Sequence, residues 1–273
     1  MTSQGGTIPT ARGGTILTAV LRSHRRSLLL WALAVSAVAA LYTLFYPSIG
    51  AEKMEVLLES MPPELVTAMG FDSLATAEGY VTATVYSLLG AVLTLVLAIG
   101  LGARLVAGQE EDGTLELELG APVSRARIYA ERLAALWLGV LVLALVLSTA
   151  LVLLSTTLEL GLDPLDVLAA STGLLFFGGA LGTVAFSVGA ASGRRGPALG
   201  TAAALAVVSY VLSYLGPLVK APWMERLSPF HWYIGAEPLE TGFDLPGLAL
   251  LAALATAAAM GGALAFVRRD VMV

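Results

Sequence analysis

The sequence offers few side chains that could perform catalysis or bind a metal. It contains no cysteine, which excludes disulfides, iron–sulfur clusters, thiolate metal sites and cysteine nucleophiles. Its two histidines, His24 and His231, are separated by five long apolar runs and so fall on opposite sides of the membrane predicted below. Ser192, in Gly189-Ala190-Ala191-Ser192-Gly193, has neither the spacing of a serine hydrolase motif nor a histidine to activate it. We expect no enzyme active site, no metal and no cofactor in this chain.

The sequence also lacks the common site for ATP hydrolysis. A P-loop, G-x-x-x-x-G-K-[ST], needs a lysine at the end of a glycine-rich loop. The only two lysines are Lys53, which follows Glu52, and Lys220, which follows Val219. Ion-coupled transporters usually keep ionisable side chains inside the membrane, at a cost of about 2.5–3.5 kcal/mol each, and the long apolar runs contain none. Energy for active transport is therefore expected to come from another subunit.

Charged residues with a distinctive spacing lie between the second and third apolar runs. In the stretch Gln109–Leu119 three acidic residues follow Gln109, and from Leu115 leucine alternates with glutamate. The alternation alone indicates a strand, but a single strand would have no partner here, so we predict a short amphipathic helix bounded by Gly113 and Gly120. Ser124 can cap the helix that follows. Such a helix pair forms a protrusion that another protein could bind; an ordinary solvated loop is the alternative.

The composition indicates which elements hold these residues. Apolar residues form 57% of the 273 residues, charged residues only 13%, and the mean hydropathy is +0.84. Too few polar residues remain to cover a soluble fold, so an all-α membrane protein is predicted. The net charge of -5 argues against nucleic-acid binding. Six uncharged runs are long enough to span a bilayer: Leu28–Tyr46, Val81–Ala103, Leu133–Leu158, Val167–Ser192, Ala198–Val219 and Leu245–Val267.

The basic residues orient these spans. All but three of the 15 lysines and arginines fall on one predicted side, and only Lys53, Lys220 and Arg226 fall on the other. By the positive-inside rule both termini are predicted to be cytoplasmic. Ala37-Val38-Ala39 resembles a signal-peptide cleavage site, but the apolar run continues to Tyr46, so we expect an uncleaved first span.

The segment before the first span is predicted to contact the membrane surface. Residues 1–14 are rich in glycine and threonine and are expected to be flexible. Apolar residues then recur at helical spacing, so residues 15–27 are predicted to form an amphipathic helix at the cytoplasmic lipid surface. Its basic residues are Arg22, Arg25 and Arg26. A plain basic flank of the first span is the alternative.

The segment before the last span, Lys220–Asp244, combines prolines and aromatic rings with few charges. Aromatic side chains of this kind are typical of the membrane interface. We predict short helices that enter the outer leaflet; a surface loop anchored by its rings is the alternative.

Two stretches of the sequence resemble ABC-2 type transporter permeases. Glu110-Glu111-Asp112-Gly113-Thr114-Leu115-Glu116-Leu117, followed by Ala121-Pro122-Val123-Ser124-Arg125, is similar to the acidic-Gly-Thr-Leu-Glu and Pro-Val-Ser-Arg motifs that this family carries between its second and third spans. Glu118 and Leu119 depart from the small or apolar residues more usual there. Leu227-Ser228-Pro229-Phe230-His231-Trp232 resembles the outer segment before the family's last span, and the six-span layout agrees over almost the whole chain.

The resemblance, nearest to half-sized permeases of bacterial drug and polyketide-antibiotic exporters, implies a fold like that of type V ABC exporters in the bacterial cytoplasmic (inner) membrane. It implies a second six-span permease, identical or related, and two P-loop ATPase subunits that bind ATP and Mg. Gln109–Leu119 would be the coupling helix on the ATPase, with the Ile16–Arg26 helix as a second contact. The implied coupling residues are Gln109, Glu110, Glu111, Asp112, Gly113, Thr114, Leu115, Glu116, Pro122, Ser124 and Arg125.

The resemblance to this family implies that spans two and five line the transport path. The residues predicted for its wall are Tyr86, Thr94, Tyr210 and Tyr214, and those predicted for an outer gate are Pro229, Phe230, His231 and Trp232. The expected function is ATP-driven export of a hydrophobic or amphiphilic compound. A nucleotide-independent secondary transporter or channel, and an assembly subunit without transport, are the alternatives.

Overall fold

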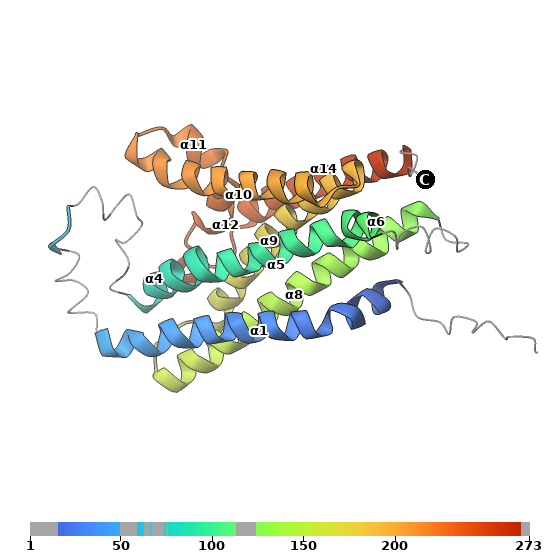
Figure 1. Cartoon of the computed structure of the whole chain (residues 1–273). Helices are drawn as coiled ribbons and strands as arrows, with labels where there is room; N and C mark the ends of the chain where they lie inside the picture. Colours follow the sequence, from blue (N-terminus) through green and yellow to red (C-terminus); the bar gives the residue numbers. More distant parts are fainter. Residues whose placement is uncertain are drawn as a thin grey trace, which may run out of the picture.

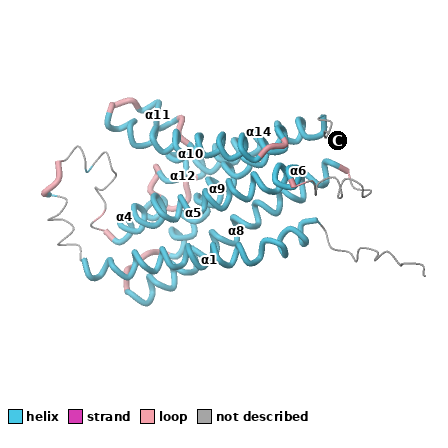
Figure 2. Tube along the Cα trace, viewed as in Figure 1, coloured by secondary structure: helices cyan, strands magenta, loops and turns pink. Residues whose placement is uncertain are grey.

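The computed structural model describes residues 16–49, 59–62, 66, 74, 76–112 and 124–268, and of residues 16–25, 48 and 49 the backbone alone. Across these ranges the chain forms helices and no strand (Figure 2). Six helices are long and apolar enough to cross a membrane, which confirms the six predicted spans. They are α1 (Ile16–Ile49), the continuous helix from α4 (Ala77–Val81) to α6 (Gln109–Glu111), α8 (Arg125–Leu158), α9 (Pro164–Ser192), α10 (Arg195–Leu218) and α14 (Leu245–Arg268).

Helix α1 includes the segment that was predicted to be a separate interfacial helix. It runs from Ile16 through the first span to Ile49 without a break. No glycine or proline interrupts the sequence between Ile16 and Tyr46, so nothing there ends a helix. The side chains of Arg22 and Arg25 lie outside the described part, as do residues 1–14, so their predicted roles stay predictions.

Short polar side chains and prolines set the helix ends. Ser124 begins α8, and its Oγ accepts a hydrogen bond from the backbone N–H of Arg127 at 3.3 Å, as predicted. Asp163 begins α9 in the same way, with Pro164 at the first helical position. Helix α9 ends at Gly193, whose φ of 68° suits a residue without a side chain.

Helix α9 lies at the centre of the bundle, packed against α5 (Ala91–Ala103), α8, α10 and α14 (Figure 1). Small residues allow α5 and α9 to approach closely. A Cβ on Gly102 would clash with the carbonyl oxygen of Gly182, and one on Gly182 would lie 3.0 Å from the carbonyl oxygen of Ala98. Stripes of small residues hold helices together where lipid removes the hydrophobic drive for association. A Cβ on Gly178 would lie 2.7 Å from the Thr94 side chain of α5, so Gly178 and Gly182 both serve packing inside this subunit.

The second span contains two stretches of π-helix. One is η1 (Thr82–Gly90), near its start, and the other is η2 (Arg104–Gly108), just before α6. π-Helical turns are uncommon and occur often at functional sites. The second stretch directly precedes the residues that the sequence singled out for coupling.

The two ends of the bundle differ in composition (Figure 1). Arg125 and Arg195 begin α8 and α10, Arg268 ends α14, and Arg104 begins η2, seven residues before the second span ends at Glu111; we call this the arginine-rich end. The opposite end carries α11 (Pro222–Arg226), α12 (Pro229–Ile234) and α13 (Pro238–Thr241), and we call it the aromatic end. These three helices confirm the prediction of short helices before the last span, and each begins with a proline.

Candidate coupling site and transport groove

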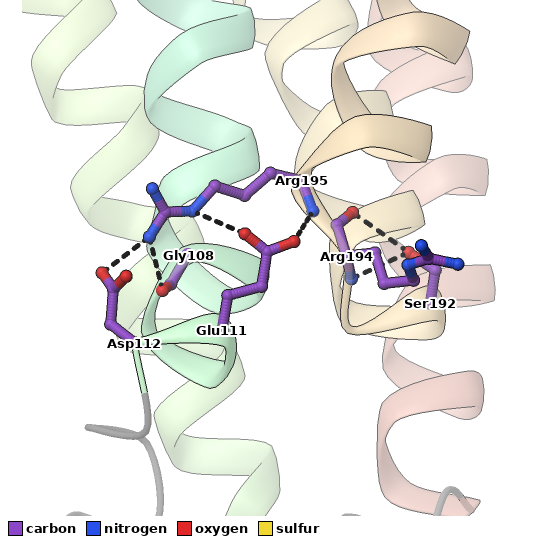
Figure 3. Close-up of polar contacts among 6 residues, drawn as sticks. All are labelled: Gly108, Glu111, Asp112, Ser192, Arg194 and Arg195. Carbon is purple, nitrogen blue, oxygen red and sulfur yellow. Dashed lines mark hydrogen bonds and ion pairs between the residues drawn. The ribbon is translucent and has the colours of Figure 1, made fainter.

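At the arginine-rich end, one arginine ties the end of the second span to the start of α10 (Figure 3). The backbone N–H of Arg195 donates to Glu111 Oε1 at 2.8 Å, and its Nε lies 3.2 Å from Glu111 Oε2. Its Nη2 donates to Asp112 Oδ2 at 2.6 Å and to the carbonyl oxygen of Gly108 at 2.7 Å. The Glu111 carboxylate thus satisfies an N–H in the first turn of α10, where the helix dipole favours negative charge. We call Gly108, Glu111, Asp112 and Arg195 the Arg195 clamp.

A second arginine holds the same stretch of the second span from α8. The side chain of Arg132 is fully buried, and its guanidinium donates to the carbonyl oxygen of Leu105 at 2.7 Å and to Gln109 Oε1. A buried guanidinium is costly unless its donors are paired. The partners lie four residues apart on one helix face, so Arg132 fixes the position of η2 and α6 against α8.

The structure brings part of the predicted coupling set together. Gln109, Glu111 and Asp112 meet at the arginine-rich end, where Glu110 also lies half-buried in α6 and Arg125 begins α8. In the structure Gln109–Glu111 end the second span and do not begin a new helix. Five predicted coupling residues lie outside the described residues, so their role stays a prediction: Gly113, Thr114, Leu115, Glu116 and Pro122.

Sequence reasoning missed the two arginines that hold this region. Arg132 and Arg195 were counted only toward the orientation of the spans. Arg194 and Arg195 are adjacent, and nothing in the sequence distinguishes them. In the structure the side chain of Arg195 joins the clamp, whereas Arg194 contributes only backbone contacts to Ser192 (Figure 3).

An open apolar groove of about 500 Å³ lies between α1, α5 and α10. Its lining includes Trp31 of α1, Val96 and Gly100 of α5, and Val207 of α10. It belongs to the half of the bundle nearer the arginine-rich end, because its α10 residues come from that helix's first half and its α5 residues reach down to Arg104. The volume is within the range of roughly 300–1,000 Å³ typical of pockets for small molecules.

None of the four residues predicted for the path wall lines this groove. Tyr86 is fully buried and Thr94 almost so; Tyr86 Oη lies 2.8 Å from Ser171 Oγ on α9, and Thr94 packs against Gly178. Tyr210 and Tyr214 lie further along α10, in the aromatic end. The groove does lie between the predicted spans, two and five. The sequence could not select the faces because no charged residue marks one face of α5, or of α10 beyond Arg195.

The aromatic end is closed by packed rings. The ring of Phe230 lies 5.2 Å from that of Tyr210 and 5.8 Å from that of Phe177, with the ring planes nearly perpendicular. Tyr233 stacks on Phe177 at 5.2 Å, and its hydroxyl donates to the carbonyl oxygen of Tyr86 at 3.2 Å. Burial raises the pKa of the Tyr233 hydroxyl well above its usual value, and the nearby Tyr86 adds to the shift. We call Phe177, Tyr210, Tyr214, Phe230 and Tyr233 the ring cluster.

The residues predicted for the outer gate lie in or beside the ring cluster. Pro229 and Phe230 are buried in α12, and His231 and Trp232 are half-buried on the same helix. Ser228 caps this helix by accepting from the His231 N–H at 3.1 Å. The Trp232 indole N–H donates to the carbonyl oxygen of Arg226 at 2.7 Å.

Within the described ranges no group of three histidine or acidic side chains could hold a metal ion. The molecule has an apolar groove toward one end, packed aromatic rings at the other, and two arginines that fix the acidic end of the second span between α8 and α10.

Comparison with known protein families matches residues 14–267 to the family described as the C-terminal domain of the multidrug efflux system permease Rv1217c. Comparison with curated proteins finds no match. The family match covers nearly the whole chain and confirms the resemblance to ABC-2 type permeases noted from the coupling motif. With its six membrane-spanning helices, the chain belongs to this family of multidrug efflux permeases.

Proposed function

We propose that this chain is the membrane subunit of an ATP-binding cassette exporter. It carries a hydrophobic or amphiphilic compound outward, driven by ATP that two separate P-loop ATPase subunits hydrolyse. A second six-span permease, identical or related, completes the membrane part in the bacterial cytoplasmic membrane. The arginine-rich end faces the cytoplasm, as the positive-inside rule expects.

The observation that carries this proposal is the Arg195 clamp. It joins the last turn of the second span to the first turn of α10, and these two spans form the walls of the groove. A force that a partner subunit applies to the acidic stretch starting at Gln109 would therefore be transmitted to both walls of the groove together. The chain has no P-loop of its own, so a partner must supply that force.

The two ends suggest a state open to the cytoplasm. The groove lies in the half of the bundle near the arginine-rich end, and the ring cluster packs at the other end. Movement of the second span and α10 would separate Tyr210 and Tyr214 from Phe230 and open the outer side. Alternating access of this kind needs no catalytic residue in the permease.

The test begins with affinity purification of the tagged full chain from its own cells, where a P-loop ATPase is expected to co-purify. Reconstituted with that ATPase, the complex should move fluorescent amphiphilic dyes only when ATP is present. Glu111→Arg with Glu116→Arg should break the complex and leave membrane insertion intact. Glu159→Arg, which reverses an exposed charge at the far end of α8, is the matched control. Dye movement by this chain alone without nucleotide would instead identify a secondary transporter and overturn the proposal.

A further inference from the structure

The groove has one apolar stretch and one polar end. Val92, Val96 and Ile99 of α5 face Ala203 and Val207 of α10 across it. A Cβ added to Gly100 would meet nothing within 4 Å, so the groove floor there is open space. The charge in the lining comes from Arg104, which lies at the arginine-rich end of the groove, where Ser27 of α1 supplies a hydroxyl.

The guanidinium of Arg104 has no acidic partner among the described residues. Arg127 pairs with Glu131 at 2.7 Å, and Arg195 pairs with Glu111 and Asp112. Arg132 donates to a backbone carbonyl oxygen and to Gln109. Arg104 is exposed, yet within the described part of the chain no carboxylate lies within ion-pair distance of it. A cation at the rim of an apolar groove in a membrane is stabilised by an anion brought to it.

We infer that the groove selects amphiphiles with one anionic group, which binds Arg104 while the apolar body lies between α5 and α10. The inference rests on the proposed function, because it assigns the groove to the transported compound. A carboxylate, sulfonate or phosphate matches the planar donor set of the guanidinium. A groove of about 500 Å³ fits a body of drug size. Arg104 is then the residue that determines specificity for the charge of the cargo.

The test uses two dyes that share an apolar body and differ in charge: anilinonaphthalene sulfonate, an anion, and phenylnaphthylamine, which is neutral. Binding to the full chain in nanodiscs of neutral phosphatidylcholine is followed by energy transfer from tryptophan, including Trp31 in the groove wall. The wild-type chain should bind the sulfonate at least about tenfold more tightly than the neutral dye, as expected for one charge-assisted contact.

Three variants distinguish the effect of the Arg104 charge on dye binding from the effect of the space in the groove. Arg104→Gln should remove the preference for the sulfonate and leave binding of the neutral dye unchanged, while Arg104→Lys should keep most of the preference. Gly100→Leu fills the open space beside Gly100 in the groove and should weaken the binding of both dyes. Arg194→Gln, which removes an arginine at the same end but outside the groove, is the matched control and should behave as wild type. Equal binding of both dyes by the wild type, or a preference that survives Arg104→Gln, would overturn the inference.

Two further experiments distinguish a bound lipid from transported cargo as the source of the anion, and failure of this inference from failure of the proposed exporter function. If nanodiscs of anionic phosphatidylglycerol abolish sulfonate binding by the wild type, the site belongs to a resident lipid and the cargo assignment fails. If binding follows Arg104 but the complete complex moves neither dye with ATP, the proposed exporter function fails and the selectivity of the groove stands. The inference is supported when ATP-driven transport of the sulfonate falls at least about tenfold in Arg104→Gln but not in Arg194→Gln.

Discussion

The two ends of the bundle are held together by different physics. At the arginine-rich end, the Arg195 clamp joins side chains that are between about a third and two-thirds exposed, through charges and hydrogen bonds. At the aromatic end, Phe230 is 3% exposed and contacts four other rings. Exposed ion pairs contribute only about 0.2–1 kcal/mol each and exchange readily with water, whereas buried rings cannot separate without losing their packing. The proposed function assigns movement to the first end and the seal to the second.

The largest expected effect comes from removing the central ring of the seal. Phe230→Ala deletes ring contacts to both α9 and α10, and a buried Phe→Ala change typically destabilises by about 3–5 kcal/mol. We expect a clearly lower midpoint of thermal unfolding for the purified chain in detergent. Phe243→Ala is the matched control, because Phe243 lies near the same end but is 47% exposed; surface changes of this kind stay within about 0.5 kcal/mol. Equal shifts in the two variants would show that the ring cluster does not hold this end.

A smaller effect on stability, but a specific effect on transport, is expected when the Arg195 clamp is reversed. Arg195→Glu places a third carboxylate beside Glu111 and Asp112 and removes the donor to the Gly108 carbonyl oxygen. The thermal midpoint should change little, because the pairs are exposed. ATP-driven dye transport by the complete complex should fall by at least about tenfold, equivalent to about 1.4 kcal/mol, because the second span no longer moves α10.

The control for this reversal is one residue away. Arg194→Glu makes the same change in charge, but the Arg194 side chain takes no part in the clamp. It should transport as the wild type does. If Arg194→Glu and Arg195→Glu lose transport equally, net charge at this end matters and the clamp does not.

The membrane-spanning helices could be predicted well from the sequence because a membrane strongly restricts the length and composition of a span. Spans need about 20 apolar residues, and arginines prefer one side, so length and charge alone found all six. Pro222, Pro229 and Pro238 are typical of helix starts, and each begins one of the short helices.

The sequence could not predict which face of each span meets its neighbours. Periodicity reveals a helix face only when polar residues mark the other face, and η1 and α5, which hold Tyr86 and Thr94, contain no charged residue to mark one. Tyr86 and Thr94 were therefore predicted in the path but lie inside the subunit. Arg195 was indistinguishable from Arg194, because the partner carboxylates are more than 80 residues away in the sequence.

The smallest expected effect tests whether charge matters at the aromatic end at all. Partial burial raises the pKa of the Glu240 carboxyl on α13 above its usual 4.5, and the carboxylates of Glu237 and Glu78 raise it further. The folded chain therefore holds this proton more tightly than the unfolded chain does. The resulting stability is fully present below pH 4.5 and is lost as the pH rises through the raised value in the folded state. Glu240→Gln should flatten that part of the thermal midpoint's pH profile, and Glu159→Gln, an exposed carboxylate at the end of α8, should not. Because Glu240 is exposed, we expect Glu240→Gln to shift the thermal midpoint far less than Phe230→Ala does. An equally large shift would mean that electrostatics, and not ring packing, stabilises the aromatic end.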